Sequence, residues 1–101
     1  YAPVIGLFLK QKKNGLPMTV VGDGLQRRDF THVSDVVQAN ILASTSSNKE
    51  ILGEVFNIGT GVNHSVLDLV NLIGGSHEHI SARIGESRIT LADITKAKTM
   101  L

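Results

Sequence analysis

Apolar residues near the start of the chain recur at helical spacing. Val4, Ile5, Phe8 and Leu9 follow Pro3, which is a favourable residue at the beginning of a helix. Three lysines come directly after this apolar run, and a glycine follows them. Cations stabilise the carboxyl end of a helix dipole, and glycine suits the residue that follows a helix. The pattern therefore predicts a first helix that ends near residue 13.

Three further helices are expected from apolar spacing and capping residues. Ser34 is a suitable N-cap with Asp35 in the first turn, and the helix after it is apolar on most sides. Such a helix needs cover on more than one face. Ser65 and Asp68 form a capping-box pattern before another amphipathic segment. Asp93 is expected to cap a last helix.

Short extended segments lie between these helices. Alternating or β-branched residues predict strands at four places, residues 18–21, 28–33, 54–59 and 79–84. The glycines of the G-D-G stretch at 22–24 predict a tight turn after the first strand, because glycine adopts positive φ easily. Strands that alternate with helices indicate an α/β fold.

Composition restricts the classes of function. A chain of 101 residues, 42% hydrophobic, has room for one modest core, and it lacks an apolar run of the roughly 20 residues that cross a membrane. It has no cysteine, which excludes disulfides and thiolate chemistry. A net charge of +1 and four aromatic residues do not favour nucleic-acid binding. We expect a cytoplasmic protein that binds neither nucleic acid nor a membrane.

Several short motifs give only weak signals of function. Residues 59–61, Gly-Thr-Gly, stand where backbone N–H groups could receive phosphate, but His64 replaces the further glycine of a dinucleotide fingerprint. A tight turn explains these glycines. His77 and His79 lack a third metal ligand at a recognisable spacing, and a solvated loop is the simpler explanation. No serine, histidine and acid form a recognisable triad. We therefore expect no metal, cofactor or catalytic residues.

Arginines from distant segments give a stronger signal. In a strand over residues 28–33, Arg28, Phe30 and His32 would share one face. Arg83 and Arg88 flank a second glycine turn far along the chain. Guanidinium groups that converge from separate segments are a common way to hold a diphosphate. Exposed surface ion pairs would give the same pattern, so the residues alone leave both interpretations open.

The order of the sequence blocks resembles that of a known family. GDGLQRRDFTHVSDVVQAN, GEVFNIGTG with SVLDLV, and ARIGESRITLADITKAKTML are similar to the C-terminal part of nucleotide-sugar epimerases of the extended short-chain dehydrogenase/reductase family. Among these, the chain resembles UDP-glucose 4-epimerase-like members. The resemblance covers essentially the whole chain. It implies that residues 1–101 form a single C-terminal substrate-binding fragment of a Rossmann-type α/β enzyme, without the N-terminal NAD-binding domain.

The resemblance also implies a set of substrate-binding residues. The arginine of the R-D-F block is here Arg28, which would contact the diphosphate or ribose of a UDP-sugar. Arg83 would grip the diphosphate, and Glu86 would bind the uridine ribose. The extended segment with Val20 and Val21 would lie along the uracil.

The chain departs from the family pattern at several positions. Ile84 replaces the usual proline and Glu86 the usual aspartate, so the turn is expected to be looser. The family's catalytic pair is Tyr-x-x-x-Lys, whereas the only tyrosine here is Tyr1 and Ile5 stands four residues later. The resemblance thus implies that NAD and the proton-transfer pair belong to the parent enzyme. The fragment itself is expected to bind no cofactor and to be inactive.

The implied partners are the nucleotide-sugar substrate and the missing NAD-binding domain. Without that domain a strand edge and an apolar helix face would be exposed, which predicts self-association of the chain. A fragment of a sugar-nucleotide 4,6-dehydratase or decarboxylase is the neighbouring alternative, although R-D-F-T-H-V favours an epimerase. A non-catalytic module that binds nucleotide sugars or assembles with a partner is the alternative from another class.

Overall fold

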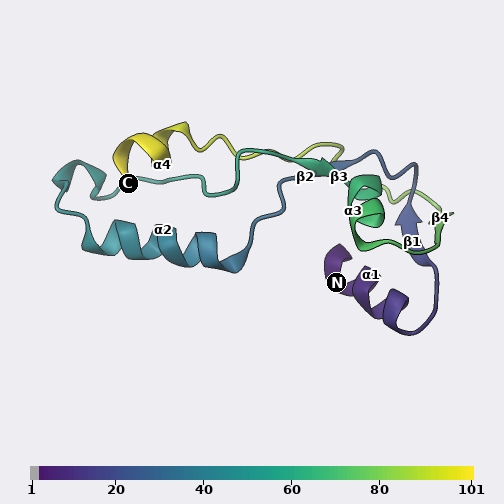
Figure 1. The fold of residues 1–101 in the computed structure, drawn as a ribbon. Coiled ribbons are helices and arrows are strands. Elements are labelled where there is room, and N and C mark those ends of the chain that lie inside the picture. Colours follow the sequence, from purple (N-terminus) through teal and green to yellow (C-terminus); the bar gives the residue numbers. More distant parts are fainter. Residues whose placement is uncertain (1–2) are drawn as a thin grey trace. The chain divides into compact units, whose positions relative to one another are not determined.

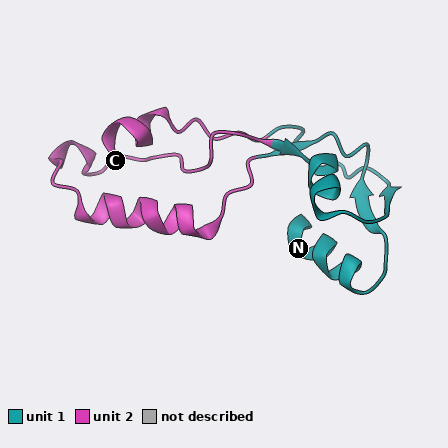
Figure 2. Cartoon of the chain, in the orientation of Figure 1, with its two compact units in different colours: residues 1–28, 64–89 teal, residues 29–63, 90–101 magenta. Residues whose placement is uncertain are grey.

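The computed structural model describes residues 3–101 and divides the chain into two compact units. Unit 1 is residues 1–28 and 64–89, and unit 2 is residues 29–63 and 90–101 (Figure 2). Tyr1, which figured in the search for a catalytic pair, lies outside the described residues. That residues 1–101 form a single substrate-binding fragment stays a prediction.

Unit 1 combines two helices with two small strand pairs (Figure 1). Strand β1 pairs in parallel with β4, with Met18 opposite His77, and β2 pairs antiparallel with β3. The first helix, the strand at 18–21 and the turn after it were all predicted and are confirmed. The elements in chain order are α1 (Val4–Lys13), β1 (Met18–Val21), β2 (Arg27–Arg28), β3 (His64–Ser65), α3 (Val66–Ile73) and β4 (His77–Ile80).

The hydrophobic core of unit 1 lies where α1 and α3 pack against β1. Phe8, Met18 and Val20 are at most 1% exposed. The apolar face of α3 completes this core with Val66, Leu69 and Val70. The helical spacing seen in the sequence therefore marks the buried faces of both helices.

Polar contacts fix α1 to the neighbouring elements. The Gln11 amide donates to Thr19 Oγ1 at 3.0 Å and accepts from the Thr19 N–H at 3.1 Å, which ties the helix to β1. Lys12 Nζ donates to the carbonyl oxygen of Ile73 at 2.6 Å, at the end of α3. A cation at this carbonyl is favoured by the negative end of the α3 dipole.

The predicted capping box at the start of α3 is confirmed. Ser65 Oγ accepts from the Asp68 N–H, and the Asp68 carboxylate accepts from the Ser65 N–H, both at 3.0 Å. The backbone hydrogen bond from Ser65 is the main reason why the pKa of Asp68 is lowered. Gly74, with φ of 76°, ends the helix.

Unit 2 contains the helices α2 (Val33–Thr45) and α4 (Thr95–Met100) and the short 3₁₀ helix η1 (Lys49–Ile51). The N-cap of α4 is Ile94, which makes no side-chain cap hydrogen bond, so the prediction of Asp93 as the cap is wrong by one residue. The Asp93 side chain still lies at the start of the helix, where Oδ1 accepts from the Thr95 N–H at 3.0 Å. The only buried hydrophobic residue among the described residues of unit 2 is Ile51. Helix α2 has no buried residue, and its exposed apolar side chains are Val33, Val36, Val37, Ile41 and Leu42.

The predictions of strands at 28–33 and at 54–59 are wrong. In place of a strand over 28–33, only Arg27–Arg28 forms β2, so the proposed shared face of Arg28, Phe30 and His32 does not exist. Residues 54–59 are not a strand either. A strand requires a hydrogen-bonded neighbour, and 54–59 pair with no other strand among residues 3–101.

Two other boundaries also differ from the predictions. The strand expected at 79–84 is β4, which starts at His77 and stops at Ile80, because the parallel register with β1 ends opposite Val21. Helix α2 begins one residue before Ser34. Its N-cap is His32, whose ring Nδ1 accepts from the Ser34 N–H at 3.1 Å.

Candidate functional site

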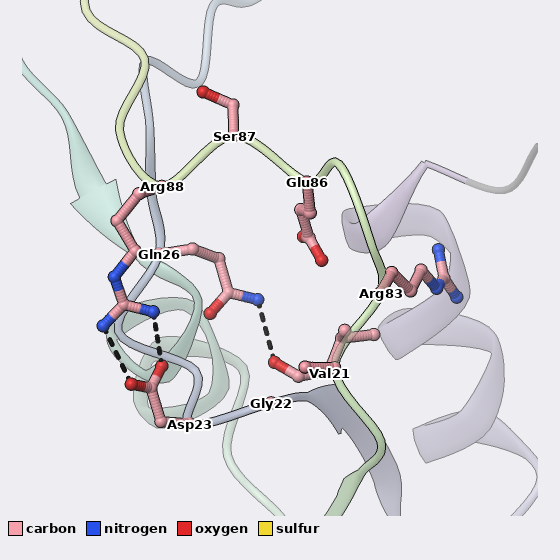
Figure 3. Close-up of a pocket in the computed structure, with 9 residues that line it drawn as sticks. Val21, Gly22, Asp23, Gln26, Arg83, Glu86, Ser87 and Arg88 are labelled. Carbon is pink, nitrogen blue, oxygen red and sulfur yellow. Dashed lines mark hydrogen bonds and ion pairs between the residues drawn. The ribbon is translucent and has the colours of Figure 1, made fainter.

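A pocket of about 200 Å³ lies in unit 1 at the carboxyl end of β1. Its walls are the turn after β1 and the loop after β4, and Figure 3 shows their side chains around a common space. Carboxyl ends of parallel strands are where α/β proteins commonly bind ligands. The lining residues are Val21, Gly22, Asp23, Gln26, Ala82, Arg83, Glu86, Ser87 and Arg88.

The wall after β1 is shaped by glycine and by a buried amide. Gly24 has φ of 73°, and a Cβ there would lie 2.7 Å from side-chain atoms of both Leu67 and Val20. Only glycine therefore fits this turn. Gln26 is 5% exposed and donates from Nε2 to the Val21 carbonyl oxygen at 3.0 Å, which closes the turn.

The two walls are joined by a bidentate ion pair. Both terminal nitrogens of Arg88 donate to the two carboxylate oxygens of Asp23, each at 2.8 Å (Figure 3). The hydrogen bond from Arg88 lowers the pKa of Asp23 to about 2. The Arg27 N–H also donates to the Arg88 carbonyl oxygen at 2.8 Å. Arg88 is thus engaged within the protein, as a link between the walls.

Arg28 and Glu86 are brought together from positions 58 residues apart. Arg28 Nη2 lies 3.4 Å from Glu86 Oε1, and the side chains are 25% and 31% exposed. Arg28 Nη1 donates to the Arg27 carbonyl oxygen at 2.8 Å. Two residues expected from the resemblance to contact the nucleotide sugar are therefore neighbours in the structure.

The other expected site residues lie differently. Arg83 lines the pocket, but its guanidinium points away from the Arg88–Asp23 pair (Figure 3). Val21 also lines the pocket. Val20 is fully buried in the core of unit 1, so only its backbone could face a ligand. The contacts of these residues with a substrate stay predictions.

Asp29 is a polar centre of unit 2 that the sequence did not reveal. Its Oδ1 accepts from Thr60 Oγ1 at 2.6 Å and from the Thr60 N–H at 3.0 Å. Its Oδ2 accepts from the N–H groups of Gly61 at 3.1 Å and Ala92 at 3.3 Å. These hydrogen bonds, that of the Thr60 hydroxyl above all, lower the pKa of Asp29 to about 2. Asp29 thereby joins three segments.

The glycine loop at 59–61 does not fit a cofactor phosphate. The N–H groups of Thr60 and Gly61, which would receive the phosphate, already donate to Asp29. A Cβ at Gly59 would lie 2.6 Å from the Ala92 Cβ and 2.7 Å from Asp29 Oδ2. The glycine thus permits close packing within unit 2. At this loop the chain offers no cradle for the NAD pyrophosphate.

The histidine pair lies on a strand, so the prediction of a solvated loop is wrong. His77 and His79 belong to the exposed β4, with ring centroids 5.4 Å apart in an edge-to-face arrangement. His79 Nδ1 lies 2.7 Å from the Gly22 carbonyl oxygen. Within residues 3–101, no three histidine or acidic side chains gather as metal ligands, and no helix has the length and apolar character needed to span a membrane.

A second hollow, of about 580 Å³, lies within unit 2 between residues of α2, the glycine loop and α4. One face of the last helix contributes Ile94, Ala97 and Leu101, the three residues that share a face by helical spacing. The α2 side contributes Ala39 and Leu42 among others. This hollow is largely apolar in its lining side chains and contains no cluster of arginines comparable with the pocket of unit 1.

Together these features define an α/β protein with an arginine-lined pocket at the end of a parallel strand. The chain belongs to the NAD dependent epimerase/dehydratase family, whose model matches residues 2–59. It is 39% identical over 100 residues to an uncharacterized UDP-glucose epimerase of Bacillus subtilis, with 93% of this chain and 31% of that protein covered.

Solved structures and other relatives agree with this assignment. The UDP-glucuronic acid 4-epimerase of Bacillus cereus, solved in complex with UDP-glucuronic acid and NAD, matches with a TM-score of 0.87 and 33% identity, covering 98% of this chain and 33% of that one. A UDP-N-acetyl-alpha-D-glucosaminuronate decarboxylase of Bacillus cytotoxicus is 39% identical over 69 residues, which is 68% of this chain and 21% of that protein. The chain thus spans about a third of the length of the first relatives it matches.

Proposed function

We propose that this chain is the C-terminal, nucleotide-sugar-binding portion of an NAD-dependent UDP-sugar 4-epimerase. The observation that carries the proposal is the meeting of Arg28 and Glu86, 58 residues apart in sequence, next to the arginine-lined pocket. Family membership and the ligands in the names of the relatives support UDP-sugars as the substrate class. The pocket has arginine side chains and the strand-end position that suit such a ligand.

Each candidate residue has a chemical role in this proposal. Arg28 and Arg83 provide charge-assisted hydrogen bonds to the diphosphate, for which Arg83 turns toward the pocket. The Glu86 carboxylate accepts hydrogen bonds from the ribose hydroxyls. The backbone of Val20 and the exposed surface of Val21 lie along the uracil. The chain thus binds and orients the nucleotide part of the substrate.

Catalysis in this proposal requires the remainder of the enzyme. The remainder of the enzyme would hold NAD, which would supply a reversible hydride acceptor for the sugar. The chain has no Tyr-x-x-x-Lys pair. The N–H groups of its glycine loop at 59–61 already donate to the Asp29 carboxylate. We therefore expect the 101-residue chain to show no epimerisation of UDP-glucose when NAD is added. Turnover by the isolated chain, measured from the appearance of UDP-galactose, would contradict this part of the proposal.

Calorimetric titration of UDP-glucose and UDP tests the binding site. Arg28→Ala and Arg83→Ala should each weaken binding about tenfold or more, because each removes charge-assisted hydrogen bonds. Arg27→Ala is the matched control, since Arg27 lies beside Arg28 but its guanidinium faces Asp68 at 3.9 Å. The affinity of the Arg27→Ala variant for UDP-glucose and UDP should stay within about twofold of that of the wild type. Equal affinities in all four proteins would remove the diphosphate assignment.

The exposed apolar face of α2 is the expected contact surface for the rest of the enzyme. Its valines, isoleucine and leucine are between 41% and 68% exposed. Clustered apolar exposure of this kind marks an interaction surface. The isolated chain should therefore self-associate, with a mass above that of a monomer by light scattering after gel filtration. A monomer at high concentration would contradict this expectation.

A sugar-nucleotide decarboxylase is the second candidate, favoured by the 39% identity to the Bacillus cytotoxicus enzyme. The R-D-F-T-H-V sequence favours the epimerase. The two are separated by incubating the complete enzyme with NAD and UDP-glucuronate. Inversion at C4 without loss of carbon supports an epimerase, whereas release of CO₂ supports a decarboxylase.

A further inference from the structure

We propose that His77 and His79 on β4 form a two-imidazole site for a divalent transition-metal ion, of the class of Zn²⁺, Ni²⁺ and Cu²⁺. The spacing along the sequence predicts no metal, because it shows no third ligand at a recognisable distance. The structure adds how the two rings lie and which nitrogen of His79 is engaged. This site does not depend on the proposed function, and its test uses different ligands.

Both histidines stand on the same face of an exposed strand. All four residues of β4 are exposed, and side chains two residues apart in a strand point the same way. In the parallel register His77 lies opposite Met18 and His79 opposite Val20, whose side chains are buried in the core of unit 1. The sheet face that carries the core on β1 thus continues on β4 with two imidazoles that solvent can reach.

The distance between the two rings suits a shared ion. Their centroids lie 5.4 Å apart, with the ring planes at 77° to each other. A zinc ion binds imidazole nitrogens at about 2.0–2.1 Å, and two such bonds at a tetrahedral angle hold the ring centroids about 5 Å apart. The strand therefore already has the spacing that chelation requires. Turning a ring about χ2, which is a soft torsion in histidine, directs its nitrogen toward the ion without moving the strand.

The hydrogen bond of His79 prepares its ring for a metal. Nδ1 lies 2.7 Å from the Gly22 carbonyl oxygen. A carbonyl oxygen can only accept, so Nδ1 carries the proton and donates, and the lone pair of the neutral ring is on Nε2. Histidines that bind metals almost always donate their other ring N–H to a carbonyl or a carboxylate, which fixes the tautomer and the ring orientation. His79 therefore presents Nε2 as a ready ligand.

The ligand set determines which ions bind and how strongly. Neutral imidazole suits zinc, nickel and copper, whereas magnesium and calcium prefer oxygen ligands. Within the described part of the chain no three histidine or acidic side chains gather, so water completes the coordination of an ion held by the two histidines. Affinity should follow the usual order of these ions, with Cu²⁺ above Ni²⁺ and Zn²⁺. It should be weaker than in a structural zinc site, which has four protein ligands.

The test is calorimetric titration of Zn²⁺ into the 101-residue wild type and three variants in which glutamine replaces one histidine. His77→Gln and His79→Gln should each weaken zinc binding at least about tenfold, because the loss of a residue that merely orients a ligand already costs about 10–100-fold. His64→Gln is the matched control, since His64 is exposed on β3, in the other strand pair. The zinc affinity of this control should stay within about twofold of that of the wild type.

Nitrogen-15 NMR of the histidine rings provides a second readout. Zn²⁺ should shift the ring nitrogens of His77 and His79 in the wild type. Mg²⁺ at the same concentration should shift neither, because it prefers oxygen ligands. Zinc-induced shifts of the His64 ring as large as those of His77 and His79 would contradict a site built by the pair.

Three calorimetric outcomes overturn the proposal. Absence of saturable zinc binding by the wild type removes the site. Equal zinc affinities in all four proteins remove it as well, because the ion would then bind elsewhere. Loss of affinity in only one of the two β4 variants shows that a single imidazole is the ligand, and the shared site falls. None of these outcomes affects the pocket for the nucleotide sugar, which is tested with UDP-glucose and UDP.

Discussion

The two units of the chain are held together by different forces. Unit 1 buries Phe8, Met18 and Val20 almost completely, together with the apolar face of α3. Unit 2 buries Ile51 as its one hydrophobic core residue among those described, and its segments converge on the Asp29 carboxylate. A hydrophobic core is the main source of stability in a domain. Unit 1 can therefore support a binding pocket by itself, whereas unit 2 depends on polar contacts.

This difference places the candidate site on the better-packed part of the chain. Val20 is buried in the core, and Val21 directly after it lines the pocket. The Arg88–Asp23 pair then fixes the second wall to the first. A binding site is more precise when rigid elements carry it. The exposed apolar residues of α2 show in contrast that unit 2 leaves a large hydrophobic surface uncovered.

The largest expected effect is the loss of the unit 1 core in Phe8→Ala. Phe8 is 0% exposed, and removal of a buried phenyl ring should cost about 3–5 kcal/mol of unfolding free energy. Leu9→Ala on the same helix is the control, because Leu9 is 52% exposed and should change stability far less. Urea denaturation of both variants measures the difference. Equal losses would contradict the assigned core.

Asp29→Ala should open unit 2 and leave unit 1 intact. The variant leaves the N–H groups of Thr60, Gly61 and Ala92 without their carboxylate acceptor, at an expected cost of about 2–3 kcal/mol. Amide hydrogen exchange should accelerate at these residues and stay unchanged in α3. Glu50→Ala, which removes an exposed acid of the same unit, is the control. Unchanged exchange at Thr60 and Gly61 in Asp29→Ala would contradict the role given to Asp29.

Acid should weaken the same contacts. The folded pKa of Asp29 is about 2, below its ordinary value of 3.8, so its contribution is complete above about pH 4 and is lost as the pH falls toward 2. Exchange at Gly61 should therefore accelerate in this range in the wild type. In Asp29→Asn the corresponding change should be absent. A wild-type profile that is flat from pH 4 to pH 2 would argue against the hydrogen-bonded carboxylate.

Among these substitutions, Ser65→Ala should lower the free energy of unfolding the least. Ser65 caps α3 by accepting from the Asp68 N–H, and loss of such a cap typically costs about 1 kcal/mol. Ser44→Ala is a suitable control, because Ser44 is exposed near the end of α2 and caps no helix start. Thermal denaturation compares the two. A larger loss in Ser44→Ala than in Ser65→Ala would contradict the assignment of the capping box.

The helices and the capping box of α3 were predictable because their signals are local, whereas the caps expected at Ser34 and Asp93 were each wrong by a residue or two. The residues that form each signal lie within one or two helical turns of one another. This holds for the apolar spacing of α1, for that of α3 and for the Ser65–Asp68 capping box, and the structure confirms all three. Strands were predicted less well, because a strand depends on a partner elsewhere in the chain. Residues 54–59 have a strand-like composition but form no strand, and β4 has the bounds that its register with β1 allows.

The candidate site was predictable only in part, for the same reason. Family blocks indicated Arg28, Arg83 and Glu86, and two of these three meet in the structure. Asp29 gave no signal, because apart from the nearby Thr31 the residues that donate to its carboxylate lie 31 to 63 residues away in sequence. The bidentate link between Arg88 and Asp23, 65 residues apart, was equally invisible. Long-range polar contacts have no local pattern from which to predict them.

The most direct test of the central claim is a two-dimensional NMR titration of the ¹⁵N-labelled chain with UDP-glucose. The account predicts saturable shifts of the amides around the unit 1 pocket, those of Val21, Gly22 and Glu86 first, and no comparable shifts around Asp29. Shifts confined to the hollow of unit 2, or no saturable shift at the unit 1 pocket, would contradict the proposal that this pocket binds the nucleotide sugar.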